Sequence, residues 1–126
     1  MKVLAHHIYE YKKGLRNLVL HTLDASLKPL AELKLQQQNI DYIIRYVTPS
    51  KINLFFGKPE CVRVIDKIGD KNLNKFTPEE DFILGTMLGY DRLQQCHRYL
   101  KKKEQENVKI EEVNNFENLK FRNPGK

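Results

Sequence analysis

The densest group of chemically capable side chains lies near the start of the sequence. Two imidazoles, two phenols, one carboxylate and three cations fall within eleven residues. The candidate binding residues are His6, His7, Tyr9, Glu10, Tyr11, Lys12, Lys13 and Arg16. Groups of these types can transfer protons, bind a metal ion or contact an acidic partner, and their spacing separates these possibilities.

Metal binding is the least favoured of the three. Ligands must converge on one point, whereas adjacent residues such as His6 and His7 point in different directions. If the segment is helical, Glu10 lies one turn beyond His6, so these two residues and a distant third ligand could form a site. We expect surface or interface histidines instead, and we predict no metal ion and no cofactor.

Catalysis lacks a recognisable motif. The sequence has no GxGxxG, GxxxxGK[ST], GxSxG or HExxH pattern. Its two cysteines form no CxxC pair; Cys61 is expected to be a buried structural residue, although a helix N-terminus could lower the pKa of its thiol. We therefore predict no catalytic residues. The alternative is an enzyme whose site forms at a dimer interface from His6, His7, Glu10 and Tyr11.

The charge distribution favours an acidic partner. The net charge is +6; residues 1–57 carry eight Lys and Arg against four Asp and Glu, and residues 101–126 carry seven against five. The segment between them is balanced, with seven of each sign. An excess at both ends of the sequence suits either an acidic protein or a nucleic acid.

Single-stranded nucleic acid is the second candidate partner. Tyr9 and Tyr11 alternate with cations, as in proteins that stack bases on aromatic rings, and Lys101–Lys103 could add phosphate contacts. However, the sequence has no RNP, KH or zinc-finger pattern. Nucleic-acid binding is therefore kept as an alternative to docking on an acidic protein.

The composition is that of one globular domain. The chain has 126 residues, of which 40% are hydrophobic and 30% charged. It has no run of about eighteen apolar residues, and its N-terminus reaches charged sequence too soon for a signal peptide. We therefore expect a cytoplasmic protein with no membrane segment and with reduced cysteines.

Periodicity and turn residues predict three strands and four helices. The strands are residues 18–23, 42–47 and 52–56, and the helices are residues 6–13, 27–38, 59–68 and 77–103. The last helix begins with a capping box at Thr77 and Glu80, and its Gly85 and Gly89 are expected to let another backbone approach closely. The nearly continuous apolar character of residues 52–56 predicts a central strand buried on both faces.

These elements predict an α+β fold. We expect a three-stranded antiparallel sheet with helices on one face, related to part of a ferredoxin-like sandwich. Its open edge strands could pair across a homodimer. Residues 1–104 are predicted to form the single domain, and residues 105–126 a charged C-terminal tail that is either docked or partly disordered.

Three long segments resemble a family catalogued as domain of unknown function 2023. They read HHIYEYKKGLRNLVLHTL, INLFFGKPECVRVI and TPEEDFILGTMLGYDRLQQC. The resemblance covers roughly residues 3–100, and it implies three strands, about five helices and a homodimer. The family has no established activity, so no catalytic residue is implied. Its loose association with genomes that use flavodoxin suggests an acidic electron-transfer protein as a partner.

Together these observations predict a non-catalytic, homodimeric interaction module for an acidic protein. Its contacts are expected from Lys12, Lys13 and Arg16, with a contribution from Lys101–Lys103. The two tyrosines of the N-terminal group would supply amphipathic contact area.

Overall fold

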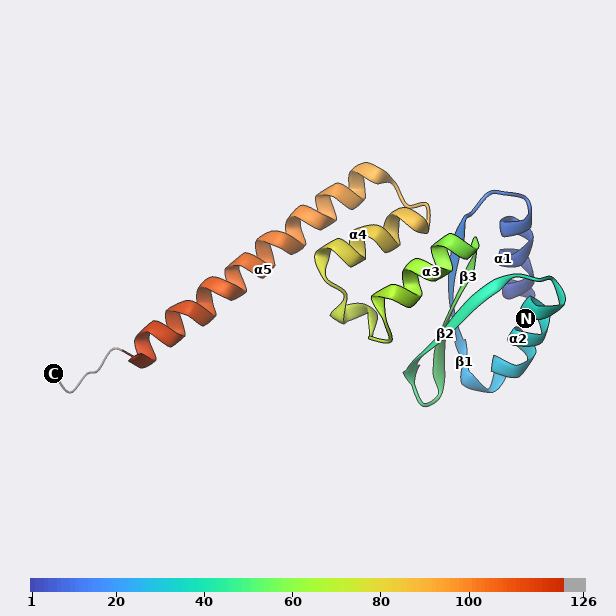
Figure 1. Ribbon diagram of the computed structural model, residues 1–126, viewed down its shortest axis with the longest axis horizontal. Coiled ribbons are helices and arrows are strands. Elements are labelled where there is room, and N and C mark those ends of the chain that lie inside the picture. Colours follow the sequence, from blue (N-terminus) through green and yellow to red (C-terminus); the bar gives the residue numbers. More distant parts are fainter. Residues whose placement is uncertain (122–126) are drawn as a thin grey trace.

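The computed structural model describes the backbone of residues 1–121 and the side chains of residues 1–115. The elements are α1 (Lys2–Lys12), β1 (Leu18–Asp24), η1 (Ala25–Leu27), α2 (Lys28–Gln37), β2 (Asp41–Thr48), β3 (Lys51–Gly57), α3 (Pro59–Ile68), η2 (Leu73–Lys75), α4 (Pro78–Met87) and α5 (Arg92–Phe121). Figure 1 shows α5 extending away from a body that the other elements form.

The three strands form one antiparallel sheet in the order β1-β3-β2. Residues 52–57 of β3 are all buried, because this strand has a neighbour on each side and helices over both of its faces. The predicted central position of residues 52–56 and the predicted α+β class are therefore confirmed.

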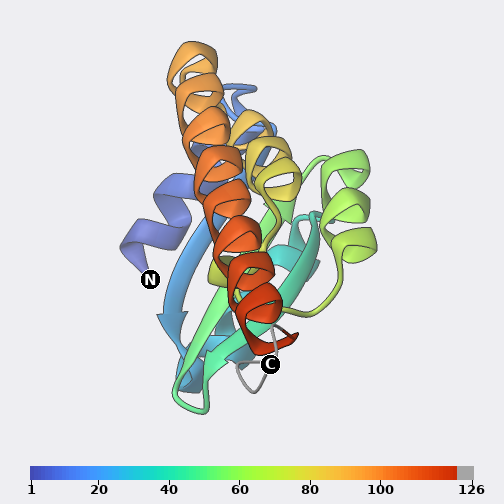
Figure 2. The ribbon, with the colours of Figure 1, turned by 90° about the vertical axis from the view of Figure 1, so that its left-hand side faces the viewer.

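Two hydrophobic cores flank the sheet, one on each face. The first core joins α1 and α2 to the sheet, with Leu4, Ile8, Val19, Leu35, Leu54 and Phe56 among its buried residues. The second core joins α3 and α4 to the opposite face, with Leu18, Phe55, Val62, Ile65, Leu84 and Leu88. Figure 2 shows α1 and α3 on opposite sides of the strands. The expectation of helices on one face was wrong, because β3 is apolar on both faces and each face needs a cover.

Most predicted helix ends are confirmed. α3 begins at Pro59 and ends before Gly69. The α4 capping box is complete, since Thr77 Oγ1 accepts from the Glu80 backbone at 3.1 Å and the Glu80 carboxylate accepts from the Thr77 backbone at 2.9 Å. α1 differs, because it begins at Lys2 rather than at residue 6, and the earlier turn buries Leu4.

The predicted helix over residues 77–103 is in fact two helices. Gly89 has φ +82°, which ends α4, and the Asp91 carboxylate accepts a hydrogen bond from the Gln94 backbone at 2.9 Å, which starts α5. A Cβ at Gly85 would overlap the buried side chain of Gln95 on α5. Gly85 therefore permits close packing of the two helices, whereas Gly89 makes the turn between them.

α5 leaves the body partway along its length. Arg98 donates to Asp81 at 2.7 and 3.0 Å, and Lys103 contacts Glu79 at 3.3 Å, so the first part of α5 is held on α4. Farther along, residues 107–115 are exposed. The helix passes through residue 104 without interruption, so the domain boundary placed there stays a prediction; the last five residues of the predicted tail lie outside the described residues. None of the helices among the described residues combines the length and the hydrophobicity that a bilayer span requires.

Candidate functional site

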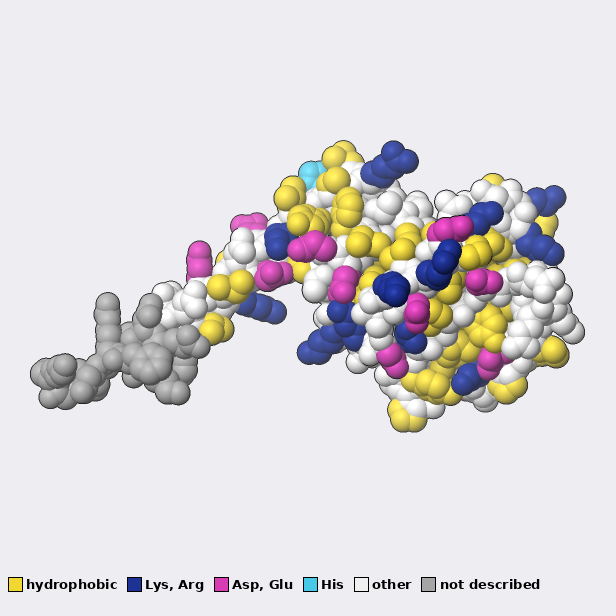
Figure 3. Space-filling model, viewed as in Figure 1, with side chains coloured by type: hydrophobic (Ala, Val, Ile, Leu, Met, Phe, Trp, Pro, Cys, Tyr) yellow, Lys and Arg dark blue, Asp and Glu magenta, His cyan; other side chains and the backbone are white. Residues whose placement is uncertain are grey.

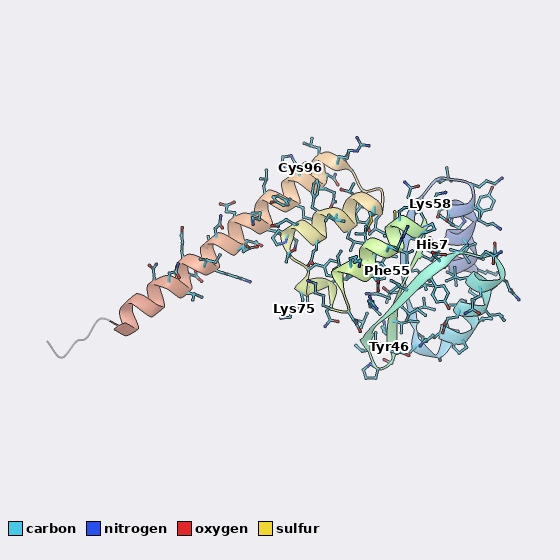
Figure 4. All side chains as sticks on the ribbon, viewed as in Figure 1. His7, Tyr46, Phe55, Lys58, Lys75 and Cys96 are labelled. Carbon is cyan, nitrogen blue, oxygen red and sulfur yellow. The ribbon has the colours of Figure 1, made fainter. Side chains whose placement is uncertain are left out.

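The N-terminal candidate residues are positioned by α1, which packs on the first core. Leu4 and Ile8 are buried, with 1% and 4% of their surfaces exposed, and they fix the helix against the sheet. This leaves His7 and Glu10 half-buried beside the sheet, and turns His6 and Tyr9 to solvent. Figure 4 labels His7 at the end of the body where α1 lies.

The half-buried residues form one polar network. Arg16 Nη1 donates to His7 Nδ1 at 3.2 Å and lies 4.0 Å from Glu10 Oε1. The same Glu10 oxygen lies 3.6 Å from His7 Nδ1 and 3.5 Å from His6 Nε2. Because a guanidinium can only donate, His7 Nδ1 accepts here, and the proton of a neutral His7 ring is on Nε2. Arg16 therefore positions His7 and Glu10.

His21 on β1 extends this network on the sheet. Its ring centroid lies 5.1 Å from that of His7. Burial lowers the pKa of His21 below its ordinary value, and the neighbouring His7 ring and the N-terminal ammonium lower it further. The sequence prediction missed His21 because a histidine within an apolar strand has the spacing of a sheet residue and gives no sign of which helix packs over it.

Tyr11 is half-buried and packs against the first core. Its ring meets Phe56 edge-on with centroids 6.3 Å apart, and the Lys58 ammonium lies 5.8 Å from its centroid. Burial raises the pKa of the Tyr11 hydroxyl, and Asp41, Cys61 and Glu60 raise it further. The Tyr11 hydroxyl is therefore a weaker acid than that of an ordinary tyrosine.

The exposed side of α1 carries the residues suited to docking. Tyr9 is 56% exposed, and the Lys13 ammonium lies 5.5 Å from its ring centroid. Lys12 donates to the Gln38 side chain at 2.7 Å, an exposed contact that a partner could replace. We call Tyr9, Lys12 and Lys13 the basic surface. Arg16 is excluded from it because its guanidinium is engaged with His7 and Glu10.

The lysines of α5 do not join the basic surface. Lys103 is paired with Glu79, and Lys102 lines a groove with Arg98 and Asp81. Figure 1 shows α1 and the middle of α5 at opposite ends of the body. The two basic segments singled out in the sequence therefore cannot contact one small ligand together.

The remaining candidates for catalysis and metal binding find no shared site. Within the described residues, no three His, Cys, Asp or Glu side chains are placed to hold a metal ion. Cys61 is half-buried against the second core, and burial followed by the nearby Glu60 raises the pKa of its thiol. This is the structural role expected for Cys61, and the lowered pKa considered as the alternative is contradicted. Cys96 is exposed on α5.

A second surface lies on the α4–α5 hairpin. Phe82 and Tyr99 pack edge-on with centroids 5.8 Å apart, and with Cys96 and Leu100 they line a hollow of about 310 Å³. Leu93 and Leu100 are 65% and 63% exposed. We call these five residues the hairpin surface. Figure 3 shows hydrophobic side chains gathered over these two helices.

A polar row across the second face of the sheet was also missed. Thr22, Asn53 and Arg45 lie opposite one another on the three strands, and Thr22 donates to Asn53 Oδ1 at 2.6 Å. The signal was available: Asn53 is the one polar residue within the buried segment 52–56. A buried asparagine in an apolar strand indicates that a hydrogen-bond partner is supplied nearby.

These features define a class of small α+β protein, with an antiparallel three-stranded sheet between two helical layers. Within this class, the chain belongs to the family described as Protein of unknown function (DUF2023), whose model matches residues 2–102. The family resemblance of the sequence is thereby confirmed. A comparison with curated proteins gave no match.

Proposed function

We propose that this protein is a non-catalytic interaction module that forms a homodimer and docks an acidic protein. The observation that carries the proposal is the hairpin surface, where large apolar side chains remain exposed although the body has two well-filled cores. Exposed apolar patches of this kind are typical of protein–protein contacts. A second copy of the chain is the partner proposed for this surface.

Self-association is supported by the shape and chemistry of the hairpin surface. A two-fold interface needs one patch that can pack against itself, and a hollow beside protruding leucines offers both a pocket and a knob. Phe82 and Tyr99 are anchored by their mutual packing, so the hollow is preformed. A dimer formed here would leave the basic surface of each protomer open, because α1 lies on the far side of the sheet.

The acidic partner is proposed for the basic surface. Tyr9 offers amphipathic contact area, while Lys12 and Lys13 offer charge on a rigid helix. The partner we propose is a flavodoxin-like electron-transfer protein, the acidic protein that the family resemblance suggests. Recognition of this kind depends on long-range attraction and weakens with salt.

Self-association is tested by sedimentation velocity on the full chain and on Leu93→Glu/Leu100→Glu. We expect the unaltered protein to sediment at about twice its 14.9 kDa chain mass, and the double variant to sediment as a monomer. The matched control is Leu30→Glu/Leu33→Glu, which charges two exposed leucines of α2. A monomeric unaltered protein, or a dimeric hairpin variant, would contradict the homodimer.

The acidic partner is tested by titrating the protein with a flavodoxin and, separately, with single-stranded oligothymidylate. Lys12→Glu/Lys13→Glu should abolish binding to the flavodoxin, whereas Lys51→Glu/Lys75→Glu, which makes the same charge change at exposed lysines elsewhere, should not. Arg16 is left intact because its loss would disturb α1. Binding to the oligonucleotide alone, with a steep salt dependence, would favour the nucleic-acid alternative.

A further inference from the structure

A cavity on the second face of the sheet combines unsatisfied donors with apolar walls. Its volume is about 240 Å³, and it lies between the ends of β2 and β3 and the segment over residues 69–76. In Figure 4, Phe55 marks its sheet side, and Lys75 marks the neighbouring turn η2. Phe55, Ile65 and Phe76 supply apolar walls, while Arg45 and Asn53 lie at its floor.

Arg45 has a buried donor without a protein acceptor. Its Nε is fully buried and, among the described residues, makes no hydrogen bond. The nearest carboxylate oxygen, on Asp70, is 3.9 Å away, which is beyond hydrogen-bond distance, and the Asp70 side chain is 75% exposed. A buried N–H without a partner is costly, so the site favours any acceptor that enters.

Asn53 adds a second donor beside Arg45. The two residues face each other directly across β3 and β2, and Asn53 is 8% exposed. Its Oδ1 accepts from Thr22, so the group that it can offer to a ligand is the amide NH₂, a donor. Two neighbouring donors, one of them part of a cationic guanidinium, are suited to binding the oxygens of an anion.

The charge of the cavity selects a monoanion. Lys71 also lines the cavity, but its ammonium is 2.6 Å from the Glu80 carboxylate, so its charge is already compensated. The charge of Arg45 is compensated less closely, because its nearest carboxylate oxygen, on the exposed Asp70 side chain, is 3.9 Å away. One guanidinium matches one carboxylate in planar, two-point geometry, and it compensates a dianionic phosphate less completely.

We propose that this cavity binds a small carboxylate with an apolar body, held by Arg45 and Asn53. On binding, the Arg45 side chain turns so that the guanidinium edge with the buried Nε meets the carboxylate, which also accepts from the Asn53 amide. A single ring or a short branched chain lies between Phe55 and Phe76. The volume is below the usual range for drug-sized ligands, so we assign a free small molecule rather than a segment of protein. The site is separate from both the basic surface and the hairpin surface.

The test is a titration of the full chain with benzoate, followed by backbone amide shifts in nuclear magnetic resonance. We expect saturable shifts at Arg45, Asn53, Phe55 and Gly69, and binding of neutral benzamide at least about tenfold weaker because it lacks the charge. A peptide that ends in a free phenylalanine carboxylate tests whether the ligand is instead the C-terminus of a protein. Peptide binding tighter than benzoate binding would overturn the assignment to a small molecule.

Single substitutions distinguish benzoate binding in the cavity from nonspecific electrostatic binding of an anion to a positively charged protein. Arg45→Gln should weaken benzoate at least about tenfold, whereas Arg63→Gln, which removes an exposed arginine of α3, should leave affinity unchanged. Asp70→Asn should tighten binding, because Asp70 is the carboxylate nearest to the guanidinium. If Arg45→Gln fails to fold, Arg45→Lys keeps the charge and removes Nε, and weaker binding is again expected. Equal affinity for benzoate and benzamide, or shifts that ignore these changes, would overturn the proposal.

Discussion

The polar network beside α1 and the polar row of the sheet each contain one half-buried arginine, and the two arginines differ in their hydrogen bonding. Arg16 and Arg45 are nearly equally exposed, at 23% and 21%. Arg16 Nη1 donates to the His7 ring at 3.2 Å, whereas the buried Nε of Arg45 makes no hydrogen bond among the described residues. Each arginine also lies about equally far from one carboxylate oxygen, at 4.0 Å from Glu10 and 3.9 Å from Asp70. The N-terminal group, which stands out in the sequence, thus supplies a hydrogen-bond acceptor for its own arginine. Arg45, which does not stand out, is left with a buried donor that is unpaired within the described part of the chain. Unmet hydrogen-bonding capacity, rather than density of reactive residue types, indicates where a ligand is needed.

The largest effect expected from this comparison concerns the two faces of β3. Phe56→Ala removes a ring sealed in the first core and should lower the free energy of unfolding by about 3–5 kcal/mol. Phe55→Ala should cost roughly 1 kcal/mol less, because one side of that ring lines the cavity and has fewer contacts to lose. Urea unfolding of both variants measures the difference. Equal losses would show that the second face is as tightly packed as the first.

The next effect compares the two arginines directly. Arg16→Met should lower the free energy of unfolding by about 1 kcal/mol, since it removes a charge-assisted hydrogen bond to His7 and a cation beside Glu10. Arg45→Met should change it by less than about 0.5 kcal/mol, or raise it, because the lost donor makes no hydrogen bond to the described residues and its nearest carboxylate, at 3.9 Å, is on the exposed Asp70 side chain. Chemical denaturation without added carboxylates is the measurement. A larger loss at Arg45 would contradict the contrast drawn above.

The smallest effect is a dependence on pH in the α1 network. The pKa of His21 is lowered on folding, so below its ordinary value of 6.5 the unfolded chain binds a proton that the folded chain does not. Above pH 6.5 neither state binds this proton, so His21 leaves the free energy of unfolding unchanged. Below that value, protonation of the unfolded chain lowers the free energy of unfolding. Urea midpoints between roughly pH 7.5 and pH 5.5 should show the decline. It should shrink in His21→Gln and persist in His97→Gln, which alters an exposed histidine of α5.

Local signals in the sequence predicted much of the fold. Pro59 and the Thr77 capping box placed two helix starts correctly, because such signals act within one turn of the chain. The apolar run of β3 predicted its central position. The break at Gly89 was missed because apolar residues keep a helical phase across it, although Gly89 followed by Asp91 and Gln94 is a helix stop and a new start.

The candidate site was less predictable, because its contacts depend on tertiary packing. The roles of Arg16 and His21 arise from the packing of α1 on β1, a contact that no pattern within either segment specifies. The pairing of Asn53 with Arg45 follows from strand register, which is set by the turn between β2 and β3 and by the irregularity between Tyr46 and Thr48. Sequence could mark Asn53 as unusual but could not supply its neighbours.

The length of α5 has a consequence for how this protein can diverge. The family match ends at residue 102, whereas the helix runs on to Phe121, so its outer part lies beyond the matched residues. A helix advances about 1.5 Å per residue, so adding or deleting seven residues there moves its end by roughly 10 Å while nearly the same side faces outward. An insertion of one residue in β3 would instead shift its register and move its buried side chains to the opposite faces of the sheet, which would disrupt both cores. The length of the outer part of α5 can therefore change in steps of about two turns while the packing of the body stays the same.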